Sequence, residues 1–197
     1  MNTDLIKRCQ LGDLNSYSEL YWLYSKNALG TAYLISDRKG IAEDIVQEAF
    51  IQCFNKIKSL KIPETFEVWF YKILVRTGWR MVKKYNNFIP MDDENMEGLS
   101  IGINSGLDAS ETSIIVNEAL ESLSLPLRTV VILYYFNDMT IKEISEVLGC
   151  FQGTVKSRLH NARKQLYETL NENEQQEQTS NKIICKRKGY RVDGTNA

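Results

Sequence analysis

Histidine is almost absent from this chain, and few groups are available for a catalytic or metal site. The 197 residues include one histidine, His160, and four cysteines spread along the sequence without a C-x-x-C pair. A zinc site needs four thiolate or imidazole ligands, usually as spaced pairs. Most serine-triad chemistry needs a histidine beside the nucleophile. We therefore expect no metal, no cofactor and no catalytic residue, and we expect the cysteines to be reduced thiols.

Prolines and long apolar runs are also scarce. No stretch reaches the roughly 18 apolar residues of a membrane span, and the polar first residues lack a signal-peptide core. These absences predict a cytoplasmic protein that is not inserted in a membrane. The chain has only three prolines, and its Leu and Ile residues recur at three- and four-residue steps, which favours an all-α fold. No phosphate-binding G-x-x-x-x-G-K-[ST] loop occurs.

Basic residues are missing from one segment in the middle of the chain. Residues 88–112 carry 6 acidic and no basic side chains, whereas residues 1–87 carry 13 basic and 9 acidic ones. The segment is rich in Gly, Ser, Asn and Asp and has no periodicity, so it predicts a flexible acidic linker. It separates two helical domains, residues 1–87 and 113–170. The polar segment 171–197 is expected to be a disordered tail.

Apolar periodicity places four helices in the first domain and four shorter ones in the second. The expected helices of the first domain span residues 2–11, 13–35, 38–58 and 64–85, and the second domain opens with a helix at 112–122. Ser124 is expected to cap the next helix, which has a proline in its first turn. Thr140 and Glu143 form a capping box, and Gly149 can end that helix in the left-handed conformation.

The last predicted helix carries more polar residues than a packed helix requires. Val155, Leu159 and Ala162 form its apolar stripe, and no acidic residue occurs between Glu146 and Glu168. A capped helix, a short turn with Gly and an acid-poor second helix describe a helix-turn-helix, whose second helix enters the DNA major groove. The candidate DNA-binding residues are Gln152, Thr154, Lys156, Ser157, Arg158, His160, Asn161 and Arg163. The alternative is an amphipathic bundle helix with a solvated basic face.

Four stretches of the sequence resemble bacterial RNA polymerase sigma factors of the extracytoplasmic-function (ECF) group. "GTVKSRL", residues 153–159, matches the fourth conserved region of that family without change, and "TIKEISEVLG" matches the helix before it. "AEDIVQEAF", residues 42–50, and "FEVWFYKI", residues 66–73, resemble the second conserved region. The resemblance covers roughly residues 5–170. It implies a region 2-like bundle and a region 4-like helix-turn-helix domain.

The resemblance implies a subunit that binds core RNA polymerase and directs it to promoters. The first domain would bind and help melt the minus-ten element, and the second would read the minus-thirty-five element. The polymerase contacts would be the β′ coiled-coil and the β flap. The expected surface for the coiled-coil is one face of the third helix, formed by Asp44, Gln47, Glu48 and Ile51. From spacing alone, this face is also compatible with an ordinary solvated surface.

The resemblance also implies that the loop before the fourth helix captures a base flipped out of the minus-ten element. Candidate loop residues are Ser59, Lys61, Glu64 and Thr65, and candidate cations for the DNA backbone include Lys56, Lys58, Lys72 and Arg76. Three aromatic residues at the start of the fourth helix, Phe66, Trp69 and Phe70, are expected to fill the core. The pattern leaves open whether Trp79 is a core or a stacking residue.

Two other functions fit the sequence less well. A stand-alone helix-turn-helix regulator would dimerise to read paired half-sites, but no dimer seam is evident and "AEDIVQEAF" would have no role. An enzyme ranks third, since no nucleophile, base and orienting group come together in the sequence. The resemblance also implies an anti-sigma factor as a partner.

Overall fold

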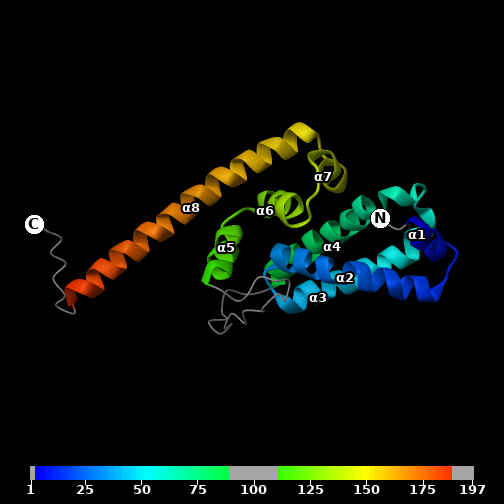
Figure 1. Ribbon diagram of the computed structural model, residues 1–197, viewed down its shortest axis with the longest axis horizontal. Coiled ribbons are helices and arrows are strands. Elements are labelled where there is room, and N and C mark those ends of the chain that lie inside the picture. Colours follow the sequence, from blue (N-terminus) through cyan, green and yellow to red (C-terminus); the bar gives the residue numbers. More distant parts are fainter. Residues whose placement is uncertain (1–2, 89–110, 188–197) are drawn as a thin grey trace, which may run out of the picture.

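The structure is a computed structural model that describes residues 3–88 and 111–187, with side chains described for residues 3–85 and 116–171. Every regular element in these ranges is helical (Figure 1). This confirms the all-α class predicted from the apolar periodicity. The expected linker, residues 88–112, lies almost wholly outside the described residues, so its flexibility stays a prediction.

The first domain is a bundle in which α2, α3 and α4 pack on one another and α1 closes one end (Figure 1). Its elements are α1 (Thr3–Gln10), α2 (Leu14–Ser36), α3 (Lys39–Lys56), the 3₁₀ turns η1 (Ile57–Ser59) and η2 (Pro63–Thr65), and α4 (Phe66–Phe88). The Asp13 side chain caps α2 by accepting from the Asn15 amide at 3.1 Å. Asp37 ends α2 in the left-handed conformation, with φ of 58°.

Aromatic rings fill the centre of this bundle. Phe66 and Phe70 are fully buried and stack with ring centroids 5.8 Å apart, and Phe50 lies 4.9 Å from Phe70. Trp69 is half-buried against the same cluster. The prediction that these residues of α4 build the core is confirmed for both phenylalanines, and Trp69 packs at the edge of the core.

The second domain contains α5 (Glu111–Glu121), α6 (Leu125–Val131), a π-helical turn η3 (Ile132–Phe136), α7 (Ile141–Leu148) and α8 (Gln152–Arg187). Ser124 occupies the N-cap position of α6, but its side chain makes no capping hydrogen bond. The capping box of α7 is present: the Thr140 amide donates to Glu143 at 2.8 Å, and the Glu143 amide donates to the Thr140 hydroxyl at 3.3 Å.

The last helix is longer than the sequence analysis predicts. The expected disordered tail starts at residue 171, whereas the backbone of α8 remains helical to Arg187. Residues 171–187 contain no Gly or Pro and are rich in Glu and Gln, which are good helix formers. A helix already nucleated by residues 152–170 can therefore propagate through them without a new nucleus. The rest of the expected tail, residues 188–197, lies outside the described residues.

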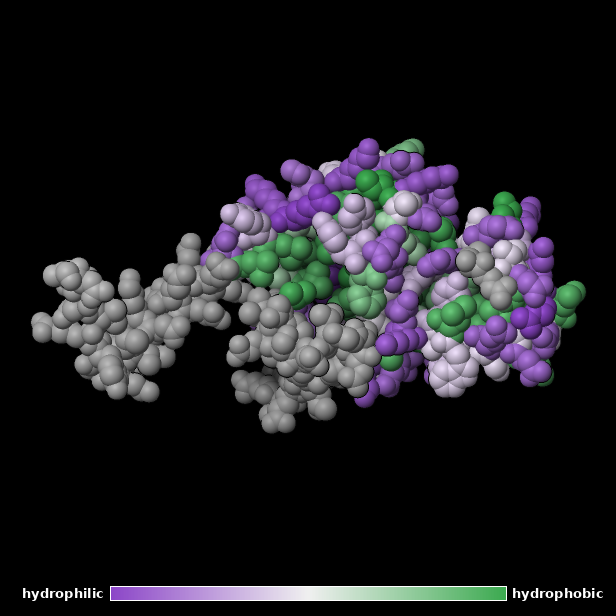
Figure 2. All heavy atoms as spheres, in the orientation of Figure 1, coloured by the Kyte–Doolittle hydropathy of each residue, from purple (hydrophilic) through white to green (hydrophobic). Residues whose placement is uncertain are grey.

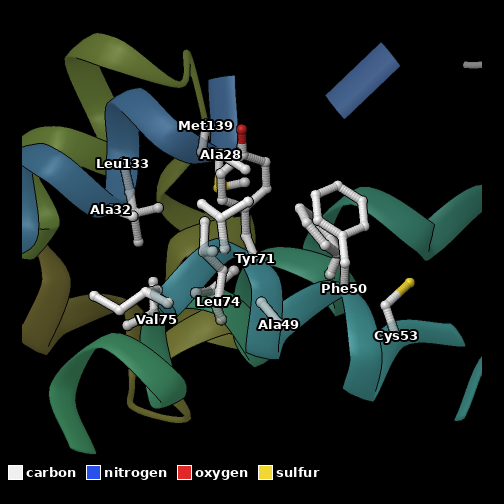
Figure 3. Close-up of a cluster of buried hydrophobic side chains, with 14 of the residues drawn as sticks. Ala28, Ala32, Ala49, Phe50, Cys53, Tyr71, Leu74, Val75, Leu133 and Met139 are labelled. Atoms are coloured by element: carbon white, nitrogen blue, oxygen red, sulfur yellow. The ribbon is translucent and has the colours of Figure 1, made fainter. Parts of the chain in front are cut away.

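The two helical domains share one hydrophobic core, which the sequence analysis does not predict. Tyr71 and Leu74 of α4 belong to the same buried cluster as Leu133 and Met139 of the second domain (Figure 3). Among the described residues, α7 packs against α4 (Figure 1), and η3 packs against α2. The described residues therefore form a closed arrangement in which the second domain rests on the first.

Candidate nucleic-acid and polymerase interfaces

The helix pair α7–α8 has the geometry that the sequence predicts for a helix-turn-helix. Gly149 ends α7 with φ of 66°, and the Cys150 amide donates to the Ser145 carbonyl at 3.0 Å. Only Cys150 and Phe151 separate this turn from the first residue of α8. The tight turn fixes the start of α8 against α7, so the first turns of α8 are held at the edge of the domain.

The apolar stripe of α8 is buried and its polar face is exposed, as predicted. Val155, Leu159 and Ala162 are 0%, 4% and 0% exposed, respectively. The candidate residues Gln152, Lys156, Ser157, His160 and Asn161 are exposed, and Thr154 and Arg158 are half-buried. Figure 2 shows mainly hydrophilic side chains along the edge that α7 and the start of α8 form. This surface presents Lys, Ser, His and Asn groups, which can hydrogen-bond base edges.

Arg163 differs from the other candidates on α8 because side chains of the same domain hold it. Its Nε donates to the Tyr135 hydroxyl at 2.8 Å, and its guanidinium lies 5.8 Å from the Tyr134 ring centroid and 5.7 Å from that of Tyr135. Cation–π contact and the hydrogen bond fix the guanidinium on the flank of α8. The sequence analysis did not identify the two tyrosines, because they come from η3, and Tyr135 lies 28 residues before Arg163 in the chain.

Most of the candidate minus-ten residues are exposed, on the loop between α3 and α4 or on these two helices. Lys56, Lys58, Ser59, Lys61, Glu64, Thr65 and Arg76 are exposed, and Lys72 is half-buried. The Ser59 hydroxyl donates to the Lys56 carbonyl at 2.6 Å, and the Thr65 hydroxyl donates to the Ile62 carbonyl at 2.8 Å. These bonds stabilise the two 3₁₀ turns. Ile62, which the sequence analysis did not single out, is 56% exposed between them.

The sequence left open whether Trp79 of α4 is a core or a stacking residue. In the structure, Trp79 lies between the two domains. It is half-buried, and its Nε1 donates to the Thr129 hydroxyl of α6 at 2.9 Å. Thr129 is fully buried and donates in turn to the Leu125 carbonyl at 2.7 Å. In the closed arrangement Trp79 is therefore a contact residue between the domains. Helical periodicity within α4 could not reveal a partner 50 residues away.

The expected polymerase-binding face of α3 is present and largely exposed. Asp44, Gln47 and Ile51 are exposed, with Ile51 at 47%. Glu48 is half-buried at the boundary with α4: it accepts from Gln52 Nε2 at 2.8 Å and pairs with Arg80 at 3.5 Å. The structure therefore brings three of the four residues to an open surface and ties the fourth to α4.

The cysteines whose surroundings are described are free thiols. Cys9 and Cys53 are buried in the first domain, and burial raises the pKa of Cys9 to about 11 and that of Cys53 to about 12. Neutral buried thiols of this kind act as small apolar core residues. Among residues with described side chains, no group of His, Cys, Asp and Glu is arranged to hold a metal ion. No described helix is long and apolar enough to cross a membrane.

Two family models match separate parts of the chain. The model described as "Sigma-70 region 2" matches residues 20–87, and "Sigma-70, region 4" matches residues 113–166. The first match covers α2, α3 and α4, and the second covers the second domain through the exposed face of α8. The two matches thus fall on the two domains that the structure shows, with the acidic segment between them.

Similar curated proteins include the RNA polymerase sigma factor SigV of Bacillus subtilis, 38% identical over 123 residues, or 62% of this chain and 72% of SigV. The ECF RNA polymerase sigma-E factor of Escherichia coli K12 is 30% identical over 174 residues, or 81% of this chain and 89% of that protein.

Two solved structures have a similar fold. One is CnrH in complex with the cytosolic domain of CnrY, with a TM-score of 0.66 and 18% identity over 86% of this chain and 97% of CnrH. The other is RpoE in complex with the anti-sigma factor NepR from Bartonella quintana, with a TM-score of 0.64, 22% identity and coverage of 80% and 98%.

Proposed function

Because this chain belongs to the ECF sigma factors, we propose that it divides promoter recognition between the two domains described above. Members of this family are transcription initiation factors rather than enzymes, and RNA polymerase and promoter DNA are their partners. In our proposal the first domain binds the polymerase and the minus-ten element, and the second domain reads the minus-thirty-five element. The protein acts in the cytoplasm, where it meets the polymerase.

The observation that carries the minus-thirty-five assignment is the division of α8 into a buried and an exposed stripe. Val155 and Leu159 hold the helix against its domain, which leaves Lys156, Ser157 and Asn161 exposed to solvent. Lys can donate to guanine O6 and N7, and Asn can pair with adenine N6 and N7. Arg158 and Lys164 are suited to phosphate contacts on either side of the base-reading residues. Arg163, held by the tyrosines, is positioned for a phosphate rather than for a base.

The minus-ten assignment rests on the loop between α3 and α4. Its 3₁₀ turns are held by their own hydroxyl groups, which leaves the Lys61 and Glu64 side chains exposed at the loop surface. Lys56, Lys58 and Arg76 supply exposed cations around it, and such cations favour the phosphate backbone. We infer that the loop receives a flipped base while the cations hold the strand.

The polymerase-binding assignment rests on the exposed face of α3. Asp44 and Gln47 provide polar groups, and Ile51 provides an apolar group that is 47% exposed. A helix face that combines an exposed apolar side chain with unpaired polar ones is suited to a protein partner. We infer that this face binds the β′ coiled-coil and that the second domain contacts the β flap.

An anti-sigma factor is a further proposed partner. The CnrH and RpoE structures are complexes, with the cytosolic domain of CnrY and with the anti-sigma factor NepR. At their level of sequence identity they establish only the similarity of fold. An anti-sigma factor for this chain is therefore inferred from family membership.

Footprinting of the reconstituted complex tests the division of roles. Core polymerase mixed with this chain should protect a minus-ten and a minus-thirty-five element on the same fragment, and neither component alone should do so. Protection of one element by the chain without polymerase would contradict the proposal and favour a stand-alone DNA-binding regulator.

A further inference from the structure

A half-buried amide, that of Asn137, links the second domain to the first. Asn137 follows η3, and its Nδ2 donates to the Thr31 hydroxyl of α2 and to the Tyr71 hydroxyl of α4, each at 2.9 Å. Thr31 is fully buried and Tyr71 is 2% exposed. The Thr31 hydroxyl donates its own hydrogen to the Asn27 carbonyl at 2.9 Å. One side chain of the second domain thus satisfies polar groups on two helices of the first, and separation of the domains must replace these bonds with water.

The second contact is a close steric approach at a glycine. Gly30 lies within α2, and a Cβ at this position would come within 2.6 Å of Phe136 Cζ and 3.0 Å of Phe136 Cε1. The ring of Phe136 therefore packs directly on the backbone of α2. A glycine inside a helix costs about 1 kcal/mol relative to alanine, so its presence here needs a packing reason. The close approach of the Phe136 ring supplies that reason.

The third contact involves the face of α4 that we assign to DNA. Trp79, whose indole donates to Thr129, shares this face with three cations by helical spacing: Lys72 seven residues earlier, Arg76 three residues earlier and Lys83 four residues later. The second domain is therefore hydrogen-bonded to the edge of the cationic stripe. Contact with a DNA strand along this stripe and contact with Thr129 compete for the same side of Trp79.

The closed arrangement brings the two DNA-reading helices too close for one promoter. The minus-ten and minus-thirty-five elements are about 25 base pairs apart, or about 85 Å of straight duplex at about 3.4 Å per base pair. In the closed chain α7 packs against both α4 and α8. Since packed helix axes lie about 8–10 Å apart, α4 and the start of α8 are within about 20 Å of each other.

We propose that Gly30, Phe136, Asn137 and the Trp79–Thr129 pair form an interdomain latch that must open before the chain can read a promoter. The proposal rests on the proposed function, because the closed state is inhibitory only if both elements are read together. The latch leaves the exposed faces of α3 and α8 accessible. It therefore acts by holding the two domains close together, and not by covering these faces. Only open chains can then bind a promoter, so the apparent affinity for the promoter is proportional to the fraction of chains that are open.

The variant Gly30→Ala tests the latch. Alanine favours the helix α2 in either state, but its Cβ collides with Phe136 only when the domains are closed. Overpacking of this kind shifts a two-state equilibrium roughly 5- to 100-fold toward the open form. Gly40→Ala is a matched control, since Gly40 also lies in a helix and a Cβ there would meet nothing within 4 Å.

The readout is the indole N–H signal of Trp79 in ¹H–¹⁵N NMR of the full chain. The three tryptophans give three indole signals, and Trp79→Phe identifies the one that belongs to Trp79. In Gly30→Ala this signal should move to the position of a solvated indole and lose its protection from hydrogen exchange, with helix content retained. Adding Phe136→Leu removes the colliding ring atoms and should restore the closed signal in part.

Transcription with core polymerase at subsaturating concentrations of the chain gives the functional readout. We expect Gly30→Ala to raise promoter output several-fold and Gly40→Ala to leave it unchanged. An unchanged indole signal in Gly30→Ala would overturn the latch itself. An open indole signal with unchanged output would overturn its inhibitory role. Absence of output from the unmodified chain at saturation would instead contradict the proposed function, and the NMR result would still stand.

Discussion

Single residues of α8 divide into those that hold the helix and those that face outward. The sequence was sufficient to make this division, because a period of 3.6 residues assigns each side chain to one face. The buried Val155 and Leu159 and the exposed Lys156 and Asn161 all lie where the period puts them. Arg163 was predicted only in part: its position on α8 is clear from the period, but its tyrosine partners are not.

Replacement of Lys156 by alanine tests the base-reading assignment. Loss of one bidentate contact should weaken binding to the preferred base by about 1–3 kcal/mol and relax the preference at that position of the minus-thirty-five element. Binding of the complete polymerase complex to a set of promoters that vary at each position measures this. Association with core polymerase should be unchanged.

Lys26→Ala is the matched control, because Lys26 is an exposed lysine on α2 and is not among the proposed DNA-binding residues. It should change neither affinity nor preference. Uniform weakening across all promoters in Lys156→Ala would show that the residue contacts phosphate and not a base.

Helix bounds were predicted correctly where they depend on residues next to the helix ends. The capping box at Thr140 and the left-handed Gly149 gave the bounds of α7 within a residue, since both ends depend on side chains next to them. The π-helical turn η3 was not predicted. It is stabilised by contacts of its rings with α2 and α8, which are far from it in the sequence.

Charge reversal on α3 tests the polymerase-binding face at the scale of one element. Asp44→Lys places a cation on the exposed stripe beside Gln47 and Ile51, and we expect at least a tenfold loss of affinity for core polymerase, about 1.4 kcal/mol. Glu48→Lys should weaken association as well, but it also breaks the contact with Arg80. A pull-down or titration with core enzyme measures both.

Glu43→Lys provides the control for charge alone, because Glu43 is exposed on α3 but points about 100° away from Asp44. Circular dichroism should show intact helix content in all three variants. Equal losses of affinity in Glu43→Lys and Asp44→Lys would mean that overall charge, rather than this face, governs association.

The whole molecule is where sequence reasoning and structure differ most. Each domain was predicted separately because its core follows periodic patterns within one segment. The shared core was not, since the bonds of Asn137 to Thr31 and Tyr71 span 106 and 66 residues and leave no periodic trace. The one available signal was Gly30, an isolated glycine in a helical pattern, which commonly marks a close approach.

A carboxyl pair between the domains predicts that closure depends on pH. Glu121 of α5 hydrogen-bonds Asp37 at the end of α2, and Arg128 of α6 and Glu118 of α5 lie near enough to act on its charge. Desolvation, the hydrogen bond to Asp37 and the Asp37 charge raise the pKa of Glu121 from 4.5 to about 7. Between pH 4.5 and about 7, the Glu121 carboxyl is therefore protonated in the closed state and ionised in the open state. Because closure takes up a proton in this range, closure is favoured as the pH falls through about 7.

The Trp79 indole signal followed from about pH 6 to pH 8 measures this dependence. The unmodified chain should open as the pH rises, whereas Glu121→Gln, which keeps a neutral hydrogen-bonding side chain, should remain closed throughout. Glu118→Gln should still open. A His160→Gln background leaves the chain without a histidine and serves as a further control. Identical pH profiles for Glu121→Gln and the unmodified chain would show that another group controls the transition.

Run-off transcription on genomic fragments, with start sites mapped, tests the central claim most directly. Core polymerase supplied with this chain should initiate at a limited set of sites that share a minus-ten and a minus-thirty-five sequence, and core polymerase alone should not. Asp44→Lys should lower this initiation at subsaturating concentrations of the chain, and Lys156→Ala should change which sites are used. Initiation at the same sites with and without the chain would contradict the account.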